Sequence, residues 1–139
     1  MFLDKRLTFD TAKALTASGN LTDTIDLGSD RDLGSGQAMY WALQLDAAAD
    51  AADGNETYSF ALQTDDNSAF SSPVTIGTIT VTRGDAIGTR YWIGMPQSNE
   101  RHLRVVATLG GTTPSVTVTS YLTGLPPTAW QAYPAGISS

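Results

Sequence analysis

Cysteine is absent from this 139-residue chain, and only two lysines, two glutamates and one histidine occur in it. Without cysteine neither disulfides nor thiolate metal sites can form, so burial and assembly must supply the stability, as in a reducing compartment. No segment approaches the ~20 apolar residues of a membrane helix. Met1, Phe2 and Leu3 are followed at once by charged residues, unlike a signal peptide. We therefore expect cytoplasmic synthesis and no membrane partner.

The charge balance is acidic, with eight Lys plus Arg against fourteen Asp plus Glu and a net charge of −6. Nucleic-acid binders normally carry a basic face. Here the basic residues are scattered, and only Arg101-His102-Leu103-Arg104 groups them. Strand alternation places His102 and Arg104 on one face, which we interpret as solvated. The sequence therefore predicts no nucleic-acid partner.

Glutamate and lysine are scarce, whereas threonine, glycine, alanine and serine are abundant. This composition favours sheet over helix. Apolar and polar residues alternate through four segments, a period typical of half-buried strands. These segments are Met39–Asp46, Tyr58–Gln63, His102–Leu109 and Val116–Leu122. Shorter predicted strands are Phe2–Phe9, Thr24–Leu27, Val74–Val81 and Arg90–Met95. Thr11–Ala17 has a helix-like pattern, and Ala47–Ala52 has a weaker one that we interpret as a loop insertion.

About eight strands separated by Gly, Asp and Asn turns, without long crossovers, predict antiparallel pairing. The expected fold is all-β: a jelly-roll or Greek-key β-sandwich. It occupies residues 1–125. Pro126 and Pro127 end the last strand, because proline cannot donate to a ladder, and an extended tail follows over 126–139.

No residue pattern predicts an active site, a metal or another cofactor, so we expect a protein that is not an enzyme. His102 has no Gly-x-Ser-x-Gly nucleophile to serve and is expected at the surface or an interface. Asp65-Asp66-Asn67 lacks the spacing of a calcium loop, which favours an Asx turn with exposed side chains. Asp26, Asp30 and Asp32 can converge on a cation, but pairing with Arg31 or capping of the loop is favoured.

Two aromatic pairs, Tyr40-Trp41 and Tyr91-Trp92, lie in predicted strands, so the members of each pair point to opposite faces. One member then fills the core while the other faces outward. Exposed Trp and Tyr are favoured at protein interfaces and also line sugar-binding platforms. Alternatively, the domain's own loops or tail cover the outward-facing aromatic side chains.

Several segments of the N-terminal half occur in a recognisable order. They are Leu3-Asp4-Lys5, Ala14-Leu15-Thr16-Ala17, Thr24-Ile25-Asp26-Leu27-Gly28, Arg31-Asp32-Leu33-Gly34-Ser35-Gly36 and Leu62-Gln63-Thr64-Asp65-Asp66-Asn67-Ser68-Ala69-Phe70. This succession resembles the capsid cement, or decoration, proteins of tailed bacteriophages. The similarity extends to about Phe70 and continues more weakly through Arg101–Leu109.

The resemblance implies a jelly-roll virion protein on the outer surface of the capsid, made in the host cytoplasm. It bridges neighbouring major capsid proteins as an oligomer, for which we favour a dimer over a trimer, and it has no catalytic residues. Candidate contact residues lie near both termini and in one strand: Met1, Phe2, Leu3, Trp92, Trp130 and Tyr133. The alternatives are a carbohydrate-binding or host-recognition sandwich and, more distantly, a small glycoside hydrolase.

Overall fold

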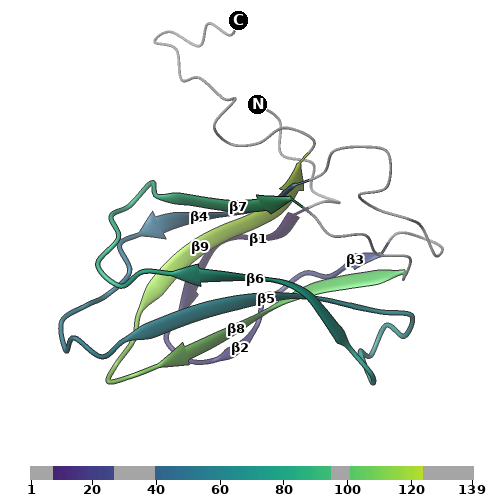
Figure 1. Ribbon diagram of the computed structural model, residues 1–139, viewed down its shortest axis with the longest axis horizontal. Helices are drawn as coiled ribbons and strands as arrows, with labels where there is room; N and C mark the ends of the chain where they lie inside the picture. Colours follow the sequence, from purple (N-terminus) through teal and green to yellow (C-terminus); the bar gives the residue numbers. More distant parts are fainter. Residues whose placement is uncertain (1–7, 27–39, 95–100, 124–139) are drawn as a thin grey trace, which may run out of the picture.

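The computed structural model describes residues 8–26, 40–94 and 101–123, and within these ranges the chain forms strands without helices (Figure 1). The strands are β1 (Thr8–Leu15), β2 (Gly19–Asn20), β3 (Ile25–Asp26), β4 (Tyr40–Ala47), β5 (Thr57–Asp65), β6 (Val74–Val81), β7 (Arg90–Gly94), β8 (His102–Gly110) and β9 (Val116–Thr123). The described ranges contain no helix long and apolar enough to span a membrane.

Two antiparallel sheets face each other, one in the order β1-β9-β4-β7 and the other in the order β2-β8-β5-β6. The short strands β2 and β3 both pair with β8, so they act as two parts of one interrupted strand. Counted in this way, the nine segments fill eight strand positions. Each sheet combines strands from distant parts of the chain, and the order is that of a jelly roll, which confirms the predicted fold class.

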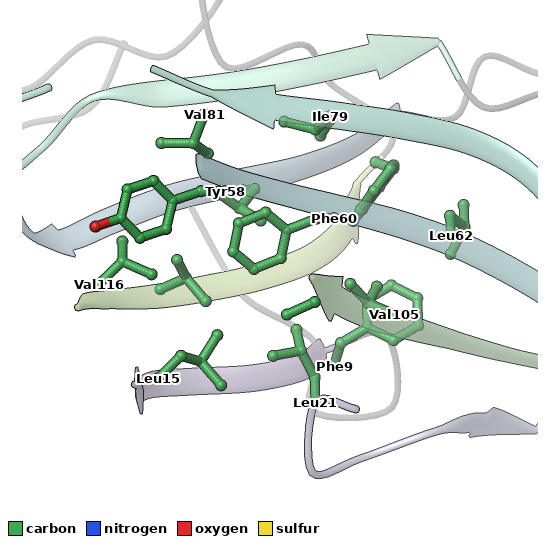
Figure 2. Packing of buried hydrophobic residues seen from close by; sticks show 14 of the residues in the cluster. Phe9, Leu15, Leu21, Tyr58, Phe60, Leu62, Ile79, Val81, Val105 and Val116 are labelled. Carbon is green, nitrogen blue, oxygen red and sulfur yellow. The ribbon is translucent and has the colours of Figure 1, made fainter. Parts of the chain in front are cut away.

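The core fills the space between the sheets (Figure 2). Alternate residues of the central strands point into it, and Trp41, Phe60 and Val105 are among those fully buried. Burying one such apolar side chain contributes about 1.5–3 kcal/mol. The period-two pattern therefore located β4, β5, β8 and β9 because one face of each strand must leave water.

The prediction for Thr11–Ala17 is wrong, because Thr11 to Leu15 belong to β1 and the next two residues form a bend, with no helix. Two register irregularities interrupt the pairing of β1 with β9, and Ala12 adopts a positive φ of 49°. Such bulges shift which side chains face inward, so β1 loses the alternation that marks a strand. The strand also begins at Thr8, whereas most of the predicted Phe2–Phe9 lies outside the described residues.

The interpretation of Ala47–Ala52 as a loop is confirmed: Ala47 ends β4, and the following residues form a loop. Ala49 is buried and exchanges backbone hydrogen bonds with the loop that follows β6. The Tyr58 hydroxyl contacts the backbone carbonyls of Asp50 and Ser115 at 2.9 and 3.2 Å. Three loops are thereby tied together and close this end of the sandwich.

Candidate functional site

The outer face of the β1-β9-β4-β7 sheet carries the one predicted contact residue that the structure describes, Trp92. Because Tyr91 and Ile93 pack against the core, Trp92 points outward, and 38% of it is exposed. The ladder places Trp92 opposite Ala42 of β4 and Ala42 opposite Tyr121 of β9. Trp92, Ala42 and Tyr121, here named the Trp92 row, thus form one row across three strands.

Tyr121 is only 3% exposed although its register places it on the outer face. Burial raises the pKa of this phenol to about 12, while the positive charge of Arg90 opposes the rise. Tyr40, in the neighbouring row, is half-buried. The face is therefore aromatic and largely uncharged around Trp92, which suits contact with another macromolecule.

The prediction that each aromatic pair divides between the two faces is confirmed. Trp41 is fully buried while Tyr40 lies on the outer face, and Tyr91 packs inward while Trp92 is exposed. The other candidate contact residues, Met1, Phe2, Leu3, Trp130 and Tyr133, lie outside the described residues. So do Asp30, Arg31 and Asp32.

A second cluster occupies the outer face of the other sheet, where the ladder places His102 between Asp26 and Asp65. Arg101 donates two hydrogen bonds to the carboxylate of Asp26, at 2.6 and 3.0 Å. His102 Nδ1 lies 3.9 Å from Asp26 Oδ1. These contacts join β3 to β8. The carboxylate of Asp26 is thus held by an ion pair with Arg101.

His102 is 8% exposed, so the prediction of a solvated surface position is wrong, while the alternative of an interface position stays a prediction. Phe70 covers it, with the two rings edge to face at a centroid distance of 6.3 Å. The guanidinium of Arg104 lies 4.5 Å from the centre of the same Phe70 ring, at a cation–π distance. His102 and Arg104 do share one face, as alternation predicts. Phe70, in the turn between β5 and β6, covers that face.

Asp65 forms the predicted Asx turn, yet its side chain is buried rather than exposed. Its carboxylate accepts N–H bonds from Asn67 at 3.0 Å and from Ser72 at 2.8 Å. These backbone donors lower the pKa of Asp65, with a smaller contribution from the charge of His102. The carboxylate therefore organises the β5–β6 turn, which explains its burial without a metal ion.

Glu56 is a buried charge that the sequence reasoning missed. Burial acts to raise its pKa, but backbone N–H groups of residues 53–56 together hold the pKa below its usual range. Asp53 N–H donates to Glu56 Oε1 at 2.7 Å. The signal was the turn Asp53-Gly54-Asn55 directly before the acid, which lets the loop wrap around the carboxylate.

An open groove of about 480 Å³ lies at the same end of β5 and β6, lined by residues 56–59 and 80–83. Threonine and serine supply much of its wall. Within the described ranges, no three His, Cys, Asp or Glu side chains come close enough to hold a metal ion. The most distinctive surface feature is therefore the Trp92 row.

Taken together, these features define a jelly-roll β-sandwich that exposes one tryptophan, Trp92, on the outer face of one sheet. Residues 9–121 match the model of the Bbp16 family, which is most of the chain. The chain belongs to the Bbp16 family. No curated protein matches the chain.

Proposed function

We propose that the chain is a cement, or decoration, protein that binds the exterior of a bacteriophage capsid and bridges neighbouring major capsid proteins. It acts through binding and not through catalysis. The observation that carries the proposal is the ordered set of N-terminal segments, since they resemble that class of protein and imply the jelly roll that the chain adopts. The fold alone would not suffice, because jelly rolls also occur in lectins and cupins.

The Trp92 row is the proposed contact surface among the described residues. A tryptophan that is 38% exposed on the outer face of a sheet buries much area on binding at low entropic cost. A protein that binds the assembled shell and not its separated subunits shifts the equilibrium towards the shell. Modest contacts repeated by symmetry and joined through an oligomer then give high avidity.

The charge of the chain fits a partner with basic patches on its outer surface. At a net charge of −6, long-range attraction would speed the encounter with such patches. Salt screens this attraction over about 8 Å at physiological ionic strength. Shell binding is therefore expected to weaken as salt is raised.

The decisive experiment is co-sedimentation of the full chain with shells of the parent phage that lack it. We expect saturable binding and a shell that survives a higher temperature when decorated. Trp92→Ala should weaken binding about tenfold, equivalent to the loss of about 1.4 kcal/mol. Ile87→Ala is the matched control, because Ile87 is 69% exposed in a loop and lies outside the Trp92 row.

Wild-type protein that fails to bind shells at micromolar concentration would refute the proposal. Removal of residues 126–139 tests the tail separately, and we expect weaker shell binding or weaker oligomerisation.

A carbohydrate-binding or host-recognition module is the second candidate, since Trp92 is exposed beside the half-buried Tyr40 on one face. Such a module would give hits on a glycan array that Trp92→Ala abolishes. Glycan binding together with no shell binding would replace the first proposal with the second.

A further inference from the structure

The jelly roll has four sheet edges, and in the described residues three of them are interrupted or short. β1 contains two register irregularities, and β2 and β3 have only two residues each. β7 is five residues long and starts with the charged Arg90. β6, in contrast, runs for eight residues without a charge, and within the described ranges it pairs on one side alone, with β5.

Unpaired edges expose backbone N–H and C=O groups that can pair with another chain, so proteins usually shorten, bend or charge them. β6 has one irregular step, before Gly77. From Gly77 to Val81 it pairs regularly with Leu62 to Tyr58. These five residues, here named the β6 edge, therefore present a regularly paired, uncharged strand to the outside.

We propose that the β6 edge pairs antiparallel with the β6 edge of a second copy of this chain, joining the two five-stranded sheets across a two-fold axis. This inference deepens the oligomeric part of the proposed function and rests on it. It assigns the self-association surface to strand pairing rather than to the chain termini.

The register of this pairing follows from the alternation of side chains. Opposite residues in an antiparallel pair point to the same face of the sheet, so the two-fold axis must pass beside a residue that faces itself. An axis at Ile79 uses the whole β6 edge. Thr78 then lies opposite Thr80 of the second copy, a favourable cross-strand pair, and Gly77 lies opposite Val81.

Charge also favours a second copy at this side of the sandwich. Two chains of net charge −6 repel each other, so they approach best where acidic groups are absent. β6 and β7 together carry a single charge, that of Arg90. The opposite side carries Asp10 and Lys13 in β1 and Asp26 in β3.

Trp92 lies on the same side as the β6 edge. β6 and β7 are the last strands in the strand orders of their sheets. They are neighbours, because a Cβ on Gly77 would lie 2.7 Å from Ile93 Cδ1. Ile93 of β7 faces β6, whereas the indole of Trp92 points away from it, so pairing of the β6 edge leaves Trp92 available for the proposed shell contact.

The first test measures the mass of the full chain in solution by sedimentation. We expect twice the 14.7 kDa of one chain. Thr78→Lys combined with Thr80→Lys places charges on the β6 edge and should return the protein to a single chain. Thr108→Lys is the control, because Thr108 is exposed on β8, a central strand of the same sheet. Circular dichroism should show that both variants keep the wild-type fold.

The second test uses the absence of cysteine in the chain. Under mild oxidation, a mixture of Thr78→Cys and Thr80→Cys proteins should give disulfide-linked dimers, while either protein alone gives far fewer. This asymmetry reports the register directly. Equal cross-linking in all three samples, or none in the mixture, would overturn the inference.

The outcomes separate this inference from the proposed function. A wild-type mass of one or three chains, or a lysine pair that stays dimeric, overturns the β6 pairing even if the protein binds shells. A dimer with the predicted cross-link that never binds shells overturns the cement function and leaves the pairing intact. Hydrogen exchange in β6 that slows only on shells would assign the edge to the shell instead of to a second copy.

Discussion

Trp41 donates its indole N–H to Ser120 Oγ at 2.8 Å, and both residues are fully buried between the sheets. Ser120 in turn donates to the backbone carbonyl of Ala42 at 3.1 Å. The hydroxyl thus links β4 to β9 and satisfies the one polar group of the largest buried side chain. A buried donor without an acceptor costs more than a hydrogen bond contributes.

Ser120→Ala should therefore lower the free energy of unfolding by about 1–3 kcal/mol, because the indole N–H loses its acceptor. Urea denaturation at neutral pH measures this loss. Thr117→Ala, at a half-buried position of the same strand that faces outward, should change stability by less than about 0.5 kcal/mol. Equal effects of the two substitutions would mean that the hydrogen bond contributes nothing of its own.

Two glycines should respond differently to alanine. At Gly111, φ is +92° and a Cβ would lie 2.4 Å from the backbone oxygen of Asn55, which cannot move without displacing its loop. Gly111→Ala should cost more than about 2 kcal/mol from backbone strain and overpacking. At Gly77 the obstacle is the end of the flexible Ile93 side chain, so thermal denaturation should show a much smaller loss for Gly77→Ala. The reverse order would contradict this account.

The fold could be predicted from the sequence where one face of a strand is buried, because burial imposes a period of two. β4, β5, β8 and β9 follow that rule, and β6 was predicted at its observed bounds. β1 was mistaken for a helix because its bulges, with Ala12 at a positive φ, break the alternation. Bulges depend on partners far along the chain, so local patterns do not reveal them.

The candidate site could likewise be predicted in part from the sequence. Alternation within β7 predicted that Trp92 faces outward while Tyr91 packs inward. It could not predict that Phe70 folds over His102, since that contact depends on the shape of the turn after β5. The amino-acid sequence also does not reveal which edges of the two sheets are left unpaired. That property belongs to the order of the strands.

The decrease in the free energy of unfolding at acid pH should depend on Asp65. Its pKa in the folded chain lies below the usual 3.8, because backbone N–H groups bind the charged form. Its contribution is therefore complete above about pH 3.8 and is lost as the pH falls through the lower folded value. Asp65→Asn should destabilise the protein at neutral pH. The variant should then lose less stability than the wild type as the pH falls, which urea denaturation from pH 6 to pH 2 measures. Asp66→Asn is the control, since Asp66 is exposed.

At alkaline pH the sign reverses for Tyr121. Burial raises its folded pKa to about 12 from the usual 10, so the unfolded chain loses this proton first. Stability should fall as the pH rises from about 10 towards 12. Tyr121→Phe should reduce that fall and remove one late-titrating phenol from the absorbance titration. A tyrosine spectrum that titrates fully near pH 10, with the protein still folded, would contradict the burial of Tyr121.

Trp41 and Trp92 allow stability and binding to be separated within one ladder. Trp41 is fully buried, so Trp41→Ala should cost about 3–5 kcal/mol and weaken binding only through unfolding. Trp92 is 38% exposed on the outer face, so Trp92→Ala should lower the melting temperature much less than Trp41→Ala. Its effect should instead appear in shell co-sedimentation. If Trp92→Ala unfolds the protein as readily as Trp41→Ala, its indole is a core element, and the Trp92 row is not an interaction surface.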